Sequence, residues 1–124
     1  MISKKLTKNI VCEGLLLLKE TQMPIQIESQ EWTRWLTTHN QFLYTGEAIQ
    51  FSARKERRRN TQYWYAYKRI KGVLVKRYLG KNNQLTHRIL DDTEEYFLND
   101  FWGKNKDNYP LSRNEYLNRH LGLF

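Results

Sequence analysis

Hydrophobic and polar residues alternate most regularly in the middle of the chain. The segments 49–58, 63–70 and 73–79 are rich in aromatic and β-branched residues, which is typical of strands. Only Lys71-Gly72 separates the second segment from the third, and because glycine tolerates a positive φ this pair predicts a two-residue hairpin turn. Residues 59–62 predict a four-residue loop between the first two segments. The middle of the chain therefore predicts three antiparallel strands.

Helical periodicity lies on either side of these strands. Ser29 offers an N-cap oxygen to a helix near residues 30–39, and Trp32, Trp35 and Leu36 share one face of that helix. After the third strand, apolar residues mark an amphipathic helix over residues 85–98 with acidic residues on its other side.

The two ends of the chain give weaker patterns. Residues 10–18 are apolar enough for a buried strand or a short helix, and periodicity does not distinguish the two. Residues 25–27 predict a short strand, and residues 103–110 predict a loop. The capping-box spacing of residues 112–115 predicts a short C-terminal helix.

Together these elements predict one α+β domain over residues 1–124, because this length is typical of a single domain. Its centre is a three-stranded antiparallel sheet packed on a helix, formed by residues 49–98. Residues 1–48 are expected to be an N-terminal strand and helix extension, and residues 99–124 a loop followed by a short helix.

Strand pairing sorts the side chains of the three strands onto two faces. The Lys71-Gly72 turn places Ala66 opposite Arg77, and the four-residue loop pairs Arg58 with Tyr63. One face, which the following helix is expected to cover, collects Phe51, Ala53, Trp64, Ala66, Ile70, Val73, Val75 and Leu79. The other face collects Ser52, Arg54, Glu56, Arg58, Tyr63, Tyr65, Tyr67, Arg69, Leu74, Lys76 and Tyr78. The second face is thus basic and interleaved with tyrosines.

The opposite assignment of the faces also has an argument in its favour. Tyrosines at strand spacing are frequently core residues, Lys68 falls on the apolar face, and a slip of one residue would exchange the faces. We place the tyrosines on the open face because the face opposite them is nearly all aliphatic.

Positive charge is concentrated in the same part of the chain. The protein carries 21 Lys and Arg against 13 Asp and Glu, a net charge of +8. Residues 49–88 hold twelve of the basic residues and one acid, Glu56, which leaves this segment at +11 and the remainder at −3. A field concentrated in this way attracts polyanions.

Known catalytic and metal-binding patterns are missing from the sequence. There is no glycine-rich phosphate loop, nucleophile elbow or HExxH motif. The single cysteine excludes an internal disulfide framework, and three widely spaced histidines do not have the spacing of a zinc site. Asp91 and Glu95 share a helix face, but acids in such a position are typical of a solvated surface. We therefore expect a non-enzymatic protein without a cofactor or metal.

A basic, tyrosine-rich strand face is typical of a nucleic-acid platform, and we predict that it binds double-stranded DNA in the major groove. A role in transcription regulation or DNA organisation follows. The expected phosphate contacts are Arg54, Arg57, Arg58, Arg59, Lys68 and Lys81. The expected base or sugar contacts are Arg54, Tyr65, Tyr67, Arg69, Lys76 and Tyr78.

Two other functions remain open at this point. The basic sheet could dock an acidic protein partner, a hypothesis that an unpaired edge strand and exposed Trp32, Trp102, Leu121 and Phe124 would favour. Alternatively, the tyrosines could stack on the bases of single-stranded nucleic acid or RNA.

The segments WYAYKR (64–69), Lys71-Gly72 and KRYLG (76–80) resemble the N-terminal arm-binding domain of tyrosine recombinases and the plant ethylene-response-factor domain. The resemblance covers about residues 49–98. It implies three antiparallel strands packed on one helix, with the sheet in the DNA major groove. In those families the positions that match Lys76 and Tyr78 contact DNA.

A longer stretch, about residues 10–98, resembles the N-terminal leader of large bacterial regulators of the ATP-dependent LuxR/MalT type. The segments that carry this resemblance are ESQEW (28–32), FSARKERR (51–58), YWYAYKR (63–69) and KRYLGK (76–81). The chain has no ATPase module or helix-turn-helix after them, so the resemblance implies a stand-alone version of the leader.

The sequence gives no membrane or export signal. Its longest apolar run, residues 15–18, is far short of the roughly 20 residues that a membrane span needs. Glu13 interrupts the apolar stretch near the start, and no small-residue cleavage site follows. We expect a cytoplasmic protein of bacterial type with no membrane partner, whether it acts alone, as a homo-oligomer or with a protein partner.

Overall fold

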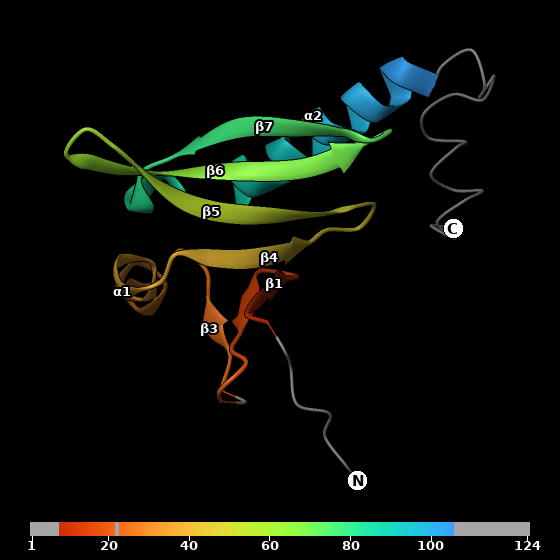
Figure 1. Ribbon diagram of the computed structural model, residues 1–124. Coiled ribbons are helices and arrows are strands. Elements are labelled where there is room, and N and C mark those ends of the chain that lie inside the picture. Colours follow the sequence, from red (N-terminus) through yellow and green to blue (C-terminus); the bar gives the residue numbers. More distant parts are fainter. Residues whose placement is uncertain (1–7, 22, 106–124) are drawn as a thin grey trace, which may run out of the picture.

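The computed structural model describes residues 8–21 and 23–105, with side chains up to residue 100. Seven strands form one mixed sheet in the order β3-β2-β1-β4-β5-β6-β7 (Figure 1). The strands are β1 (Ile10–Cys12), β2 (Leu15–Leu17), β3 (Ile25–Gln26), β4 (Gln41–Thr45), β5 (Gln50–Arg58), β6 (Thr61–Ile70) and β7 (Val73–Gly80). The helices are α1 (Gln30–Thr38), the short 3-10 helix η1 (Asn82–Gln84) and α2 (His87–Asn105).

The predicted three-stranded sheet with an N-terminal extension is wrong. β4 pairs antiparallel with β5, and β1 pairs parallel with β4, so the N-terminal strands continue the same sheet. β1 and β2 have three residues each and β3 has two, which is too short for a hydrophobic period to be recognised. The parallel pairing of β1 with β4 also joins segments about thirty residues apart, and no local pattern indicates such a contact.

The hairpin between β6 and β7 has the predicted register over most of its length. Ala66 lies opposite Arg77 and Ile70 opposite Val73, while Lys71 and Gly72 have φ values of 53° and 79°. Towards the other end, an irregularity between Trp64 and Tyr65 places Trp64 opposite Gly80 instead of Leu79.

The loop between β5 and β6 is shorter than predicted. Arg58 pairs with Thr61 rather than with Tyr63, so the turn consists of Arg59 and Asn60. Arg59 supplies the positive φ, 58°, that a tight turn requires. Because the register differs from the predicted one by two residues, every side chain stays on its predicted face.

The hydrophobic core lies between the sheet and both helices, on one face of the sheet. As predicted, this face buries Trp64, Ala66, Phe51 and Leu79. The ring centroids of Phe51 and of Phe97 in α2 are 5.6 Å apart. Val73 lies on the same side of its strand but is 54% exposed at the start of β7. The faces assigned from the sequence are therefore confirmed, although the core does not cover Val73.

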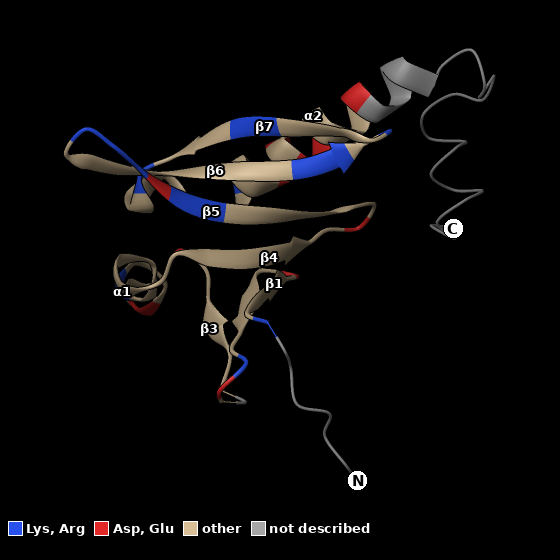
Figure 2. Ribbon diagram, in the orientation of Figure 1, with Lys and Arg blue, Asp and Glu red and all other residues tan. Residues whose placement is uncertain are grey.

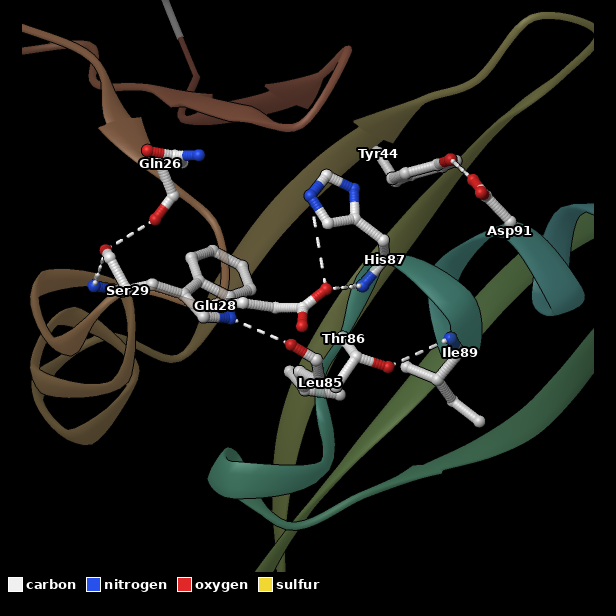
Figure 3. Close-up of polar contacts among 10 residues, drawn as sticks. Gln26, Glu28, Ser29, Tyr44, Leu85, Thr86, His87, Ile89 and Asp91 are labelled. Carbon is white, nitrogen blue, oxygen red and sulfur yellow. Dashed lines mark hydrogen bonds and ion pairs between the residues drawn. The ribbon is translucent and has the colours of Figure 1, made fainter.

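The predicted helix starts have clear structural causes. The hydroxyl of Ser29 accepts a hydrogen bond from the backbone N–H of Trp32 at 3.2 Å, as an N-cap residue does. The indole N–H of Trp32 donates to the carbonyl of Leu85 at 2.9 Å, which joins α1 to the segment before α2 (Figure 3). Trp32 is thus buried and is not the exposed residue that the partner-docking alternative supposed.

The start of α2 is also held from two sides (Figure 3). The Thr86 hydroxyl accepts from the backbone N–H of Ile89 at 3.3 Å, and the Glu28 carboxylate accepts from the backbone N–H of His87 at 2.8 Å. A carboxylate at a helix N-terminus is stabilising because it faces the positive end of the helix dipole. Glu28 itself has a φ of 68°, so the turn before α1 is bent to bring it there.

Three predictions for the ends of the chain need correction or lie outside the described residues. Residues 10–18 form two strands joined by a turn at Glu13 and Gly14, both with positive φ, rather than one strand or one helix. α2 continues through Asn105, so a loop beginning at residue 103 is wrong. The predicted helix at 112–121 lies outside the described residues.

We expect Trp64→Ala to destabilise the fold far more than Tyr67→Ala. Trp64 is fully buried, contacts the ring of Phe42 at 5.3 Å and donates to the Asn82 side chain at 2.7 Å. Removing a buried tryptophan costs about 3–5 kcal/mol, a large part of the stability of a small domain. Thermal melts of both variants check this, and a lower melting temperature for Tyr67→Ala would contradict the assignment of the faces.

Tyr44 links the sheet to α2 and should make the fold sensitive to alkaline pH. It is buried, and its hydroxyl donates to the Asp91 carboxylate at 2.7 Å (Figure 3). Burial, and then the bond to Asp91, raise the pKa of Tyr44 far above its ordinary value of 10.0. Above pH 10 the unfolded chain therefore releases this proton while the folded chain keeps it, and stability falls as the pH rises.

Tyr44→Phe is expected to lose about 1 kcal/mol of stability at pH 7, because one hydrogen bond to a hydrated carboxylate is removed. The difference in the free energy of unfolding between this variant and the unchanged protein should narrow between pH 9 and 11. The unchanged protein loses stability over that range, whereas phenylalanine does not ionise. Urea unfolding across that range measures both effects. Tyr78→Phe, at a tyrosine that is 51% exposed, is the control and should give a constant difference. A constant difference for Tyr44→Phe would show that the burial of Tyr44 does not make the stability of the fold depend on alkaline pH.

Candidate nucleic-acid interface

The face of the sheet opposite α1 and α2 carries a patch of cations and tyrosines on β5, β6 and β7. Figure 2 shows Lys and Arg along these three strands and in the turn between β5 and β6. We call this patch the basic tyrosine face. It comprises Arg54, Glu56, Arg58, Tyr63, Tyr65, Tyr67, Arg69, Lys76 and Tyr78.

Three tyrosine rings form the centre of the basic tyrosine face. Tyr65 lies directly opposite Tyr78 in the pairing of β6 with β7, and their ring centroids are 5.7 Å apart. The ring of Tyr63 is 5.8 Å from the same Tyr78 ring. Cross-strand aromatic pairs of this kind stabilise a sheet and give it a rigid surface.

Cations from β5 and β7 lie over the tyrosine rings of β6. The Lys76 ammonium is 4.2 Å from the centroid of Tyr65 and 5.5 Å from that of Tyr67. The guanidinium carbons of Arg54 and Arg58 are 5.2 Å from Tyr67 and 5.4 Å from Tyr65, respectively. These cation–π contacts hold the cations over the tyrosine rings, because the ring faces attract positive charge.

Glu56 is the acidic residue of this face and has no predicted role. One of its carboxylate oxygens is 2.9 Å from Arg58 Nη2 and 3.0 Å from Lys76 Nζ. It therefore joins a cation of β5 to a cation of β7, across β6. The alternation of β5 places Glu56 on this face, but only the arrangement of three strands brings Lys76 within its reach.

The predicted phosphate-contacting residues do not all lie together. Alternation places Arg57 and Lys68 on the helix side of their strands, where Arg57 is exposed and Lys68 is half-buried. Arg59 is exposed in the turn between β5 and β6. Lys81 follows β7 and reaches back to 5.9 Å from the ring of Tyr63. Arg69 lies on the basic tyrosine face but donates to the Gly72 carbonyl at 3.0 Å.

One cation of the positively charged segment belongs to the core side. The Lys55 ammonium donates to the carbonyl of Leu36 at the C-terminal end of α1 and lies 5.4 Å from the ring of Trp64. Burial lowers the pKa of Lys55. A cation at a helix C-terminus stabilises the helix, so the charge of Lys55 serves the fold.

Among the described residues, no group of three or more His, Cys, Asp or Glu side chains is arranged to hold a metal ion. In the same part of the chain, no helix is long and apolar enough to cross a membrane. No family model matches this chain, and neither a curated protein nor a solved structure matches it.

Proposed function

We propose that the protein binds double-stranded DNA by placing β5, β6 and β7 in the major groove, with the basic tyrosine face against the DNA. The observation that carries this proposal is the exposed row of cations held over tyrosines on a face that neither helix covers. A role in transcription regulation or DNA organisation would follow from such binding.

The dimensions of these strands fit the groove. Neighbouring strands lie about 4.8 Å apart, so three strands span about 10 Å between the outer two. The major groove of B-form DNA is about 12 Å wide, which is close to the span of the three strand axes. A wider part of the seven-stranded sheet would not enter it.

The positions of the side chains suggest a division of labour. Lys76 and Arg54, near the middle of the face, would reach base edges, whereas Arg58, Arg59 and Lys81, at one end of the hairpins, would contact phosphates. Lysine and arginine can donate to the acceptors of guanine, and phosphate contacts set the register of the protein on the duplex.

Duplex DNA is favoured over single strands because the tyrosine rings are already occupied. Lys76 and Arg58 both lie over Tyr65, and Arg54 lies over Tyr67. A base that stacked on either ring would compete with these cations, whereas phosphates and groove-edge acceptors can be bound without moving them.

A specific observation supports the docking of an acidic protein as the second candidate. β7 is the edge strand of the sheet, and Val73 and Leu74 at its start are 54% and 53% exposed. An acidic extended segment could pair with this edge and complement Lys76 and Arg77.

Affinity for duplex DNA is expected to fall steeply with salt. If about half of the twelve cations of residues 49–88 neutralise about 5 to 7 phosphates, log K against log salt has a slope of roughly −5, and affinity drops about a thousandfold between about 50 and 200 mM salt. Arg58→Ala should flatten the slope by up to about 1 and weaken all sequences alike, while Lys76→Ala should reduce discrimination between sequences. Titrations of duplex, single-stranded DNA and an acidic peptide compare the candidates. Absence of duplex binding at low salt would reject the proposal.

Glu56→Gln should strengthen DNA binding. The substitution removes the negative charge that pairs with Arg58 and Lys76, so both cations become available to phosphates. We expect a steeper salt slope, by up to about 1 to 2, and tighter binding at low salt. Asp92→Asn makes the same charge change on α2 and is the matched control. If both variants bind DNA with the same affinity, the effect is one of net charge, and the ion pairs of Glu56 do not limit DNA binding.

A further inference from the structure

A hollow of about 560 Å³ adjoins the basic tyrosine face and shares Arg54 with it. Its floor is formed by β4 and β5, including Leu43, Ser52 and Arg54. One wall is the end of α1, and the other is formed by residues 8–9 and 19–20, which precede β1 and follow β2. Residues that flank the N-terminal strands β1 and β2 thus form part of this hollow.

The charged side chains that line the hollow are mostly cationic. Lys8, Lys19 and Arg54 contribute three positive charges, and Glu20 contributes one negative charge. Lys8 and Lys19 are both exposed, so their ammonium groups are available to a ligand. A hydrated phosphodiester fits a space of this size, since one water occupies about 30 Å³ in the liquid.

Hydrogen bonds of the backbone hold the walls in place. The side-chain oxygen of Asn9 accepts from the backbone N–H of Lys19 at 2.8 Å, and its carbonyl accepts from the N–H of Leu43 at 2.9 Å. The Asn40 carbonyl accepts from the N–H of Lys55 at 2.8 Å, which ties the end of α1 to β5. Asn9 therefore positions Lys19 relative to β4 without itself needing to touch a ligand.

Arg54 connects the hollow to the basic tyrosine face. It lines the hollow, and its guanidinium lies 5.2 Å from the ring of Tyr67. Ser52, also in the floor, pairs directly with Tyr67. The hollow and the basic tyrosine face are therefore one continuous surface across β5.

From these positions we infer that the hollow binds the DNA backbone that flanks the major groove. β4 lies two strands from β6, which is about 10 Å at the usual strand spacing, while half the groove width is about 6 Å. With β6 at the centre of the groove, the hollow stands over the sugar-phosphate backbone, and Lys8 and Lys19 bind its phosphates. This inference rests on the proposed function and adds a second contact region to it, which binds phosphates independently of the DNA sequence.

The test compares two double variants that remove the same charge. Lys8→Ala with Lys19→Ala removes the cations of the hollow, and Arg34→Ala with Arg88→Ala removes two exposed cations of α1 and α2. Titrations of one duplex over about 50 to 200 mM salt give the slope for each protein. We expect the first variant to flatten the slope by up to about 2 and to weaken binding on the order of tenfold to fiftyfold near 0.1 M salt, with the control unchanged. Lys8→Arg with Lys19→Arg should restore the slope.

The outcomes separate the inference from the proposed function. If the unchanged protein binds the duplex and both double variants give the same slope, the hollow does not contact DNA and only the inference fails. If the unchanged protein does not bind at low salt, the proposed function fails as well. Amide shifts of Lys19 and Ser52 with inorganic pyrophosphate provide the second arm. Tighter binding of pyrophosphate than of duplex at equal phosphate concentration would assign the hollow to a small anion and overturn the inference.

Discussion

The burial of Trp64 is the constraint on which the two faces of the sheet depend. Its indole fills the space between β6 and the helices, contacts the ring of Phe42 and donates to the side chain of Asn82. Because side chains alternate along a strand, burying Trp64 and Ala66 forces Tyr65 and Tyr67 to the opposite face. A shift of the strand register by one residue would not keep Trp64 buried. It would expose the indole and bury the neighbouring tyrosines and their cations.

The same constraint sorts the positive charge of the middle segment. Lysine and arginine on the tyrosine side gather over the rings, where Lys76 and Arg54 are held by the ring faces. Lysine on the helix side must instead find an acceptor, and Lys55 does so at the end of α1. The positive charge of this segment thus divides between the tyrosine side of the sheet and the support of a helix, because successive residues of a strand point to opposite faces.

The proposed interface combines rigidity with incomplete neutralisation. Tyrosine rings and Glu56 hold the cations in place, but one carboxylate cannot neutralise all of the cations around it. In the proposed complex, such a surface would bind a polyanion without first having to order its own side chains. The hollow at β4 extends the positive surface past the width of a groove, which is why the N-terminal strands matter to the proposed function as well as to the fold.

The period-two pattern of residues 49–79, the Lys71-Gly72 turn and the Ser29 cap could all be predicted from the amino-acid sequence, and the two faces follow from them, since each depends on neighbours within a few positions. The sequence also placed Tyr65, Tyr67, Lys76 and Tyr78 on one surface. The extension of the sheet by β4 and β1, and the contact of Glu56 with Lys76, became visible only in the folded structure. Strands of two or three residues carry no readable period, and a parallel pairing across thirty residues depends on contacts that form only when the whole core has assembled.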